Sequence, residues 1–398
     1  MVKIKPFEVE QWMDRLETTP GVLNIAETCA ASISIDDLMH MCEDKNAPGP
    51  LSLSTKLTYG AIRGSETLRR RAAALFDRAS DAAPLEADNV LITQGAIAAN
   101  FLVLYTLVGP GDHVICVYPT YQQLYAVPES LGASVSLWKL KRENGHVPDV
   151  GELEGLVEAN TKMIIINNPN NPTGSTIPKS VLKEIVAFAK ARNIIVFSDE
   201  VYSPLYHSLP PDQDAPPSVL ALGYEKTVAT GSMSKAFALA GIRTGWIASR
   251  DPAIIDALAA ARDYTTISVS QLDDQVASYA LSEPVLGPLL ARNRQLAQAN
   301  LGMLSAFVER HAGVCSWVTP TAGTTALVQF KRGGVPVDDA SFVLDVLDKT
   351  KVLFMPASPC FGHGKDFKGF VRIGYVCETE VLVDALVKLE GYIDDYLT

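Results

Sequence analysis

The chain has 398 residues, 47% of them hydrophobic, and its formal net charge at pH 7 is -11. This length suggests two packed regions rather than one ordinary core. The acidic balance argues against non-specific nucleic-acid binding but not against a local basic site for a small anion, and no window approaches the roughly 20 apolar residues that span a bilayer.

The cysteines and histidines are dispersed along the chain. The six cysteines include no Cys-x-x-Cys pair, which favours reduced thiols over disulfides or a metal site. Residues 1–17 are charged throughout and contain no apolar signal core. We therefore expect a soluble, cytoplasmic protein that binds no metal, no nucleic acid and no membrane.

In chain order, the first chemical signal is a strand that passes through Gly95 into a helix over residues 96–108. Backbone N–H groups at such a helix start suit a phosphate. Residues 177–193 predict another helix, and Val- and Ile-rich runs predict strands that are buried on both faces. The runs span residues 113–118, 162–168, 193–199, 226–232 and 242–249. The alternation predicts an α/β fold in which helices sandwich a mostly parallel sheet.

Polar residues follow two of these strands, at the edge where ligands bind in such sheets. The turn NNPNNPTG contains Asn171 and Gly174, which are either turn formers or part of a binding site. Asp199 ends the run IIVFSD, where a carboxylate is costly unless it meets a cation or hydrogen-bond donors. It is either a helix cap or the partner of a protonated ligand nitrogen. The Pro-rich residues 208–218 are expected to form an exposed loop.

Lys235 lies in an apolar, glycine-rich stretch, TGSMSKAFALAGIRTGW. A lysine shielded from water has a lowered pKa, and a neutral amine can form a Schiff base with an aldehyde. Arg243, together with Ser232 and Ser234, could hold a phosphate dianion. An aldehyde, a phosphate and a ring nitrogen that needs a carboxylate together describe pyridoxal 5′-phosphate. The alternative is an ordinary surface lysine.

The pattern changes near residue 283. Residues 283–311 predict one long helix, and shorter strands and helices follow. We expect a large cofactor-binding domain over residues 49–282. A smaller α/β domain is expected to consist of residues 1–48 and 283–398.

Over residues 55–376, these motifs resemble the class I/II aminotransferase family of fold-type I pyridoxal-phosphate enzymes. The resemblance rests on the order and spacing of Asn171, Asp199 and Lys235. It implies pyridoxal 5′-phosphate as cofactor and Lys235, Asp199 and Tyr202 as catalytic residues. Lys235 would form the Schiff base and carry the proton at the substrate α carbon. Asp199 would pair with the ring nitrogen, and Asn171 and Tyr202 would hydrogen-bond the ring hydroxyl.

The same resemblance implies further contacts. Tyr121 would stack on the ring, and Arg372 would pair with the substrate α-carboxylate, beside Asn171. Tyr59 would reach the phosphate bound by the other subunit, which implies a homodimer. The phosphate would lie among Gly95, Ala96, Ile97, Ser232, Ser234 and Arg243. Ile97 departs from the polar residue that is frequent there, and Ala357 from a glycine.

The family chemistry acts at the α carbon of an amino acid, and we expect transfer of the amino group to a 2-oxo acid. Loss of a β or γ substituent would instead give elimination, replacement or cyclisation. Residues 23–38 and 261–275 are loosely similar to the subgroup that includes capreomycidine synthase. A non-catalytic regulatory domain is a remote alternative. Such proteins carry a basic DNA-binding segment, whereas this chain is acidic and shows no helix-turn-helix extension.

Glu27 belongs to a stretch that is expected to cross the active-site entrance. It is a solvated loop carboxylate, a residue that faces a cationic or hydrogen-bond-donating substrate side chain, or a second general base. The sharp turns beside the cofactor also predict cis peptide bonds at Tyr118–Pro119 and Asn171–Pro172.

Overall fold

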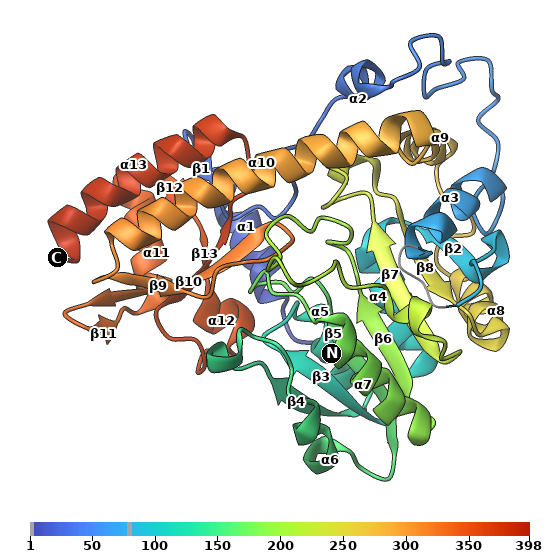
Figure 1. Ribbon diagram of the computed structural model, residues 1–398, viewed down its shortest axis with the longest axis horizontal. Coiled ribbons are helices and arrows are strands. Elements are labelled where there is room, and N and C mark those ends of the chain that lie inside the picture. Colours follow the sequence, from blue (N-terminus) through green and yellow to red (C-terminus); the bar gives the residue numbers. More distant parts are fainter. Residues whose placement is uncertain (1–3, 78–81) are drawn as a thin grey trace.

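The computed structural model describes residues 4–77 and 82–398, so residues 1–3 and 78–81 of the expected domains lie outside the described residues. Its largest sheet has seven strands in the order β2-β8-β7-β6-β5-β3-β4 (Figure 1). Strand β8 runs antiparallel to both of its neighbours, β2 and β7, and the pairs from β7 to β4 are parallel. The strands are β2 (Val90–Thr93), β3 (His113–Tyr118), β4 (Ser134–Lys139), β5 (Thr161–Asn167), β6 (Ile195–Asp199), β7 (Thr227–Ser232) and β8 (Gly245–Ser249).

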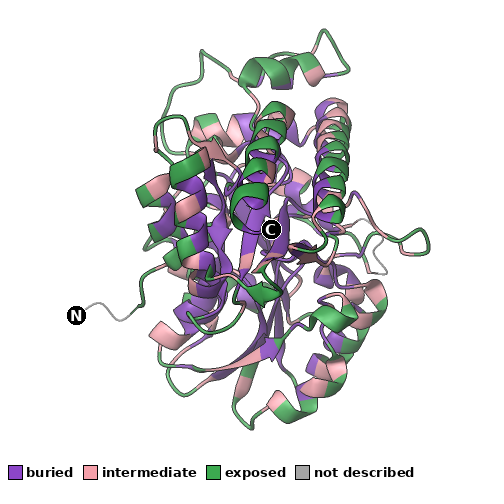
Figure 2. Ribbon diagram, turned by 90° about the vertical axis from the view of Figure 1, so that its left-hand side faces the viewer, coloured by how far each residue is buried: buried purple, intermediate pink, exposed green. Residues whose placement is uncertain are grey.

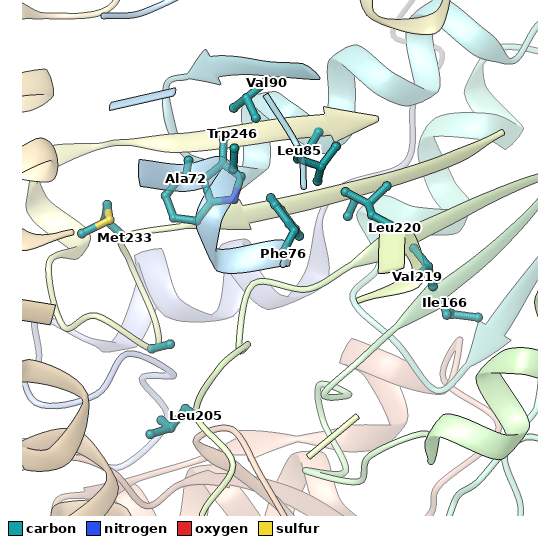
Figure 3. Close-up of a cluster of buried hydrophobic side chains, with 14 of the residues drawn as sticks. Ala72, Phe76, Leu85, Val90, Ile166, Leu205, Val219, Leu220, Met233 and Trp246 are labelled. Carbon is teal, nitrogen blue, oxygen red and sulfur yellow. The ribbon is translucent and has the colours of Figure 1, made fainter. Parts of the chain in front are cut away.

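Helices cover both faces of this sheet, because alternate residues of each buried strand point to opposite sides. In β5, Ile164 and Ile166 pack in one core, and Met163 and Ile165 pack in the other. Figure 3 shows part of the first core around Trp246, and Figure 2 shows the buried strands inside a shell of more exposed helices. The covering helices are α3 (Glu66–Phe76), α7 (Lys179–Ala191) and α9 (Gln271–Ala280) on the first core, and α4 (Gly95–Leu107), α5 (Gln123–Ser130) and α8 (Pro252–Arg262) on the second.

A second, antiparallel sheet is formed by the C-terminal part of the chain, in the order β11-β10-β14-β13, with β9 paired to β10. The N-terminal segment joins this part, because β1 pairs with β12 and Trp12 of α1 lies in the same core. These elements are α1 (Glu8–Leu16), β1 (Leu23–Asn24), α10 (Glu283–Arg310), β9 (Cys315–Trp317), β10 (Thr325–Arg332), β11 (Val335–Pro336), α11 (Asp339–Thr350), β12 (Val352–Leu353), β13 (Met355–Pro356), α12 (Ala357–Phe361), β14 (Phe370–Gly374) and α13 (Thr379–Tyr396).

The long helix α10 crosses from one part of the molecule to the other (Figure 1). Val285 and Leu289 pack in the first core of the large sheet, whereas Leu301 and Leu304 pack in the core of the second sheet. The other short elements are α2 (Ile35–Met41), α6 (Leu153–Leu156) and the 3-10 helices η1 (Ala87–Asn89), η2 (Arg142–Asn144), η3 (Val150–Glu152), η4 (Val219–Leu222) and η5 (Ala240–Ile242).

The expected elements are confirmed, with small shifts at their ends. The run predicted as a strand over 242–249 begins only at Gly245, because Arg243 adopts φ +45° in the turn before it. Residues 208–218 contain no helix or strand, as expected. Strand β4 was not predicted, because it is an edge strand in which Trp138 alone is fully buried, so it lacks a continuous apolar run.

Both expected cis bonds, Tyr118–Pro119 and Asn171–Pro172, are present. Asn168–Pro169 and Ser203–Pro204 are also cis, which the sequence analysis did not anticipate. Among residues 4–77 and 82–398, no helix has both the length and the apolar character needed to cross a membrane.

Candidate active site

A cavity of about 600 Å³ lies at the carboxyl ends of three adjacent strands of the large sheet. Asn167, Asp199 and Ser232, the last residues of β5, β6 and β7, line it. Helix α1, residues 26–29 and Arg372 of β14 complete the lining. The cavity is therefore assembled from the N-terminal, central and C-terminal parts of the chain.

Asp199 is a buried carboxylate that is held by donors instead of by a cation. Its Oδ2 accepts a hydrogen bond from Asn100 Nδ2 at 2.9 Å, and its Oδ1 accepts one from the Val201 N–H at 3.1 Å. Asn100 is oriented in turn by Thr230, whose hydroxyl donates to Asn100 Oδ1 at 2.6 Å. Burial raises the pKa of Asp199 to about 6, although both donors lower it. At neutral pH the carboxylate is thus mostly ionised and can accept a proton-bearing nitrogen.

Lys235 follows β7 and contacts the N-terminal segment. Its Nζ donates to Thr28 Oγ1 at 2.6 Å and lies 3.4 Å from both Glu27 Oε1 and Cys29 Sγ. Residue 374 allows this segment to approach, because a Cβ on Gly374 would lie 1.6 Å from the Glu27 carbonyl oxygen. Only glycine fits there, so Gly374 places residues 27–29 against the lysine.

The pKa of Lys235 differs from the expectation, because acidic neighbours surround its amine. Burial lowers the pKa of Lys235, but Cys29 and Glu27 more than offset this, so its pKa lies above the ordinary value. Lys235 in turn lowers the pKa of Glu27 to about 2. Because burial raises the pKa of the Cys29 thiol, Glu27 is the anion that faces Lys235 near neutral pH. The expected lowering of the lysine pKa is wrong for the cofactor-free protein, since the sequence did not reveal these neighbours.

An anion-binding end lies at the start of α4. Gly95 adopts φ +79°, and a Cβ there would lie 2.8 Å from Arg243 Nη2, so glycine lets the guanidinium approach the helix N-terminus. Arg243 Nη1 lies 3.5 Å from Ser234 Oγ, which accepts a hydrogen bond from Ser232 Oγ at 2.8 Å. A helix N-terminus, a guanidinium and two hydroxyls together suit a phosphate.

Arg372 enters the cavity from the second sheet and is 2% exposed. Its Nη2 donates to the Ala26 carbonyl at 2.8 Å, and its Nη1 donates to Asn171 Oδ1 at 3.3 Å. Its Nε has no hydrogen-bond partner among the described residues. A buried guanidinium with a free donor has the chemistry to bind a carboxylate.

The aromatic residues expected at the site divide into two groups. Tyr121 and Tyr202 line the cavity, as do Ala96 and Ile97 beside the anion-binding end. Burial raises the pKa of the Tyr202 phenol, so Tyr202 remains a hydrogen-bond donor at neutral pH. Tyr59, by contrast, lies outside the cavity and is 79% exposed.

Several lining residues were missed from sequence. Asn100, which holds Asp199, is a lone amide inside an apolar helix, and that pattern is the signal that could have identified it. Thr28, the hydroxyl partner of Lys235, belongs to the quoted stretch around Glu27 but carries no pattern of its own. The contribution of α1 depends on tertiary packing alone.

The donor set fits one cofactor class. A buried carboxylate, a lysine and an anion-binding helix start share a cavity, and the orphaned Arg372 Nε provides a further anion site. Enzymes of α/β fold that use this arrangement hold pyridoxal phosphate, which needs an amine for its aldehyde, a partner for its ring nitrogen and donors for its phosphate.

Comparison with known proteins supports the same cofactor class. Residues 44–389 match the family "Aminotransferase class I and II", and the chain belongs to this family. It is 29% identical over 309 residues to an aspartate aminotransferase of Thermotoga maritima, covering 77% of this chain and 76% of that protein. It is 28% identical over 291 residues to capreomycidine synthase of Streptomyces vinaceus, covering 72% and 70%.

A solved structure supports the same assignment. A PLP-dependent aminotransferase from Streptococcus suis has a TM-score of 0.87 and 36% sequence identity, with 99% of each chain covered. The protein is therefore a pyridoxal-5′-phosphate-dependent enzyme of aminotransferase type with the fold-type I architecture. The fold class, the family resemblance and the cofactor predicted from the sequence are confirmed.

Proposed function

We propose that this cavity transfers the amino group of an amino acid to a 2-oxo acid, with Lys235 as the residue that moves the α proton. The observation that carries the proposal is the convergence of Lys235, Asp199 and Arg372 on one cavity. Catalytic roles are assigned to Lys235, Asp199 and Tyr202, and substrate contacts to Arg372, Asn171 and Glu27.

When bound, the cofactor supplies an electron sink that acidifies the C–H bond at the substrate α carbon. Asp199 is mostly ionised at neutral pH, so its carboxylate would hold a proton on the ring nitrogen and keep the ring electron-poor. Lys235 Nζ would take the proton from the α carbon and pass it to the cofactor carbon that carries the amino group. Arg372 would bind the α-carboxylate, which would fix the α carbon near Lys235.

The cofactor itself is proposed to be held from three sides. Asn171 and Tyr202 would donate to the ring hydroxyl, and Tyr121 would cover the ring face. Tyr121 is already oriented, because its hydroxyl donates to Glu10 Oε1 at 2.9 Å and its ring centroid lies 4.8 Å from that of Phe7. The phosphate would be bound by Gly95, Ala96, Ile97, Ser232, Ser234 and Arg243.

A second candidate reaction is elimination, replacement or cyclisation of a specialised amino acid, which the similarity to capreomycidine synthase favours. The two candidates differ in their need for an acceptor. The test incubates the holoenzyme with a panel of amino acids, with and without a 2-oxo acid, and follows the products by mass spectrometry. Transamination requires the acceptor; catalytic product formation without it would establish the second candidate instead.

Glu27→Gln tests the segment that faces Lys235. We expect kcat/KM for the best substrate to fall about tenfold while the cofactor absorbance is kept, because the charge is lost and the size is retained. A group whose pKa is lowered to about 2 is a poor base near pH 7, so the charge role is favoured over a second general base. A change below about threefold would leave Glu27 as a loop residue only.

We also propose a homodimer in which Tyr59 contacts the phosphate of the partner subunit. Residues 51–62 contain no helix or strand and expose large apolar side chains. Leu53 and Tyr59 are 94% and 79% exposed, and Tyr264 is 93% exposed. Exposed apolar groups at this density mark interaction surfaces.

Tyr59→Phe is expected to raise the dissociation constant of pyridoxal phosphate by about two- to tenfold, the value of one lost hydrogen bond. The dimer should persist, because the ring is kept. Fluorescence titration of the cofactor-free protein gives the constant, and light scattering gives the mass. An unchanged dissociation constant would contradict the proposed contact.

We propose a large domain, 49–282, and a small domain of 1–48 with 283–398, which the pairing of β1 with β12 and the shared core around Trp12 support. We propose a cytoplasmic location, which the free state of all six cysteines supports.

A further inference from the structure

One face of α1 presents carboxylates to the cavity. Glu10 and Asp14 of α1 and Glu17, the residue directly after the helix, follow each other at helical spacing, and all three line the cavity together with Glu27. Glu10 accepts a hydrogen bond from Tyr121, whereas the side chains of Asp14 and Glu17 have no hydrogen-bond or ion-pair partner in the part of the chain that the structure describes. A rise of ~1.5 Å per residue spreads the three carboxylates of this segment over about 10 Å.

Helix α1 is fixed in this position. The Glu8 N–H donates to Gln122 Oε1 at 2.9 Å, and Gln122 Nε2 donates to the Pro6 carbonyl at 2.8 Å. Trp12, which does not line the cavity, is buried in the core of the second sheet. The carboxylates are therefore held beside the cavity by packing.

Each of the three cations that line the cavity already has a proposed partner. Under the proposed function, Lys235 serves the cofactor aldehyde, Arg243 its phosphate and Arg372 the α-carboxylate of the substrate. Arg372 lines the cavity and is 2% exposed, and its Nε has no hydrogen-bond partner among the described residues. Within residues 4–77 and 82–398, no other lysine or arginine lines the cavity. A second carboxylate on the substrate would find no counterion among the described residues of this chain and would meet Glu10, Asp14 and Glu17.

We infer that the substrate is an amino acid whose side chain ends in a cation, a guanidinium or an ammonium group. This inference rests on the proposed function, because Arg372 must hold the α-carboxylate for the side chain to extend toward α1. The distal cation then lies between Asp14, Glu17 and Glu27, and these carboxylates attract basic amino acids and repel aspartate and glutamate.

The test compares arginine, lysine, citrulline and glutamate as amino donors to pyruvate with the holoenzyme. Citrulline matches arginine in shape but is neutral. We expect kcat/KM for arginine or lysine to exceed that for citrulline at least tenfold, and the ratio to fall with added salt, since exposed charges are screened. In the Asp14→Asn, Glu17→Gln double variant the ratio should fall to about threefold or less. Glu8→Gln, a carboxylate of the same helix that does not line the cavity, should keep the ratio.

The outcomes separate the two proposals. If no amino acid donates to a 2-oxo acid, the proposed function fails, and the side-chain preference is then read from calorimetric dissociation constants of arginine and citrulline with the cofactor-loaded Lys235→Ala protein. If citrulline or glutamate reacts as well as arginine and lysine, or if the double variant keeps the ratio, the inference on the cationic side chain is overturned while transamination stands. A preference for arginine over lysine would identify the guanidinium form of the cation.

Discussion

Lys235→Ala is expected to leave less than about one per cent of the turnover of the wild-type enzyme. No other described cation of the cavity can both bind the cofactor aldehyde and move a proton at the α carbon, because Arg243 and Arg372 carry guanidinium groups and not amines. Acid–base catalysis alone is typically worth 10²–10⁴-fold. The variant should still bind the cofactor non-covalently through Asp199 and Arg243.

The measurement is single-turnover conversion of the bound cofactor, followed by absorbance, alongside steady-state kcat. Lys226→Ala is the matched control, because Lys226 is half-buried outside the cavity and its Nζ donates to Asn193 Oδ1 at 2.7 Å. That variant should keep full activity. Residual turnover above about one per cent in Lys235→Ala would contradict the assignment of Lys235 as the proton-transferring residue.

Asp199→Asn is expected to lower kcat by about 10²–10³-fold, the typical cost of removing one preorganised electrostatic group. The neutral amide cannot hold a proton on the ring nitrogen, so the α C–H bond is acidified less. Steady-state kinetics at saturating cofactor measure the effect. Asp212→Asn, in the exposed loop, is the control and should not change kcat. A loss below about tenfold would contradict the role of Asp199.

Asp199→Asn should lower the activity but raise the stability of the cofactor-free protein. Burial raises the pKa of Asp199 from 3.8 to about 6 in the folded, cofactor-free protein, so folding favours the protonated acid. The cost is absent well below pH 4, grows as the pH rises to 6 and then stays constant, at roughly 3 kcal/mol. The amide avoids this cost but loses an accepted hydrogen bond worth about 1 kcal/mol.

Cofactor-free Asp199→Asn should therefore melt at a higher temperature than the wild type at pH 7.5, and the difference should shrink toward pH 4. Differential scanning calorimetry across this range gives the two curves. Saturation with pyridoxal phosphate should reverse the order, because the wild-type carboxylate then has its partner. Equal melting temperatures at pH 7.5 would mean that the carboxylate is not destabilising.

Local patterns in the sequence were sufficient for the large sheet and the catalytic motifs. The run at β3 contains only buried residues, so its limits, His113–Tyr118, could be read directly. Lys235 and Asp199 stand out because a charge next to an apolar strand requires a reason. The edge strand β4 could not be read in this way, since its outer residues face solvent.

Contacts between distant segments could not be predicted. Thr28 and Lys235 are joined by a 2.6 Å hydrogen bond, although they are far apart in the chain. The approach of the same segment raises the pKa of Lys235 through Cys29 and Glu27, and it makes Glu27 the counterion of Lys235. The position of α1 over the cavity likewise depends on Gln122, a residue that sequence reasoning did not single out.

The pairing of β1 with β12 has a consequence for how the enzyme is made in the cell. Leu23 pairs with Val352 and Asn24 with Leu353, so β1 leaves the ribosome long before the strand that it pairs with. Until then, the nascent chain exposes the apolar side of α1, and closing so long a loop carries an entropic cost that slows assembly. The large sheet can form before β12 has been made, but residues 26–29 are held against Lys235 only after β12 and β14 have been made. A working active site thus requires the synthesis of both strands.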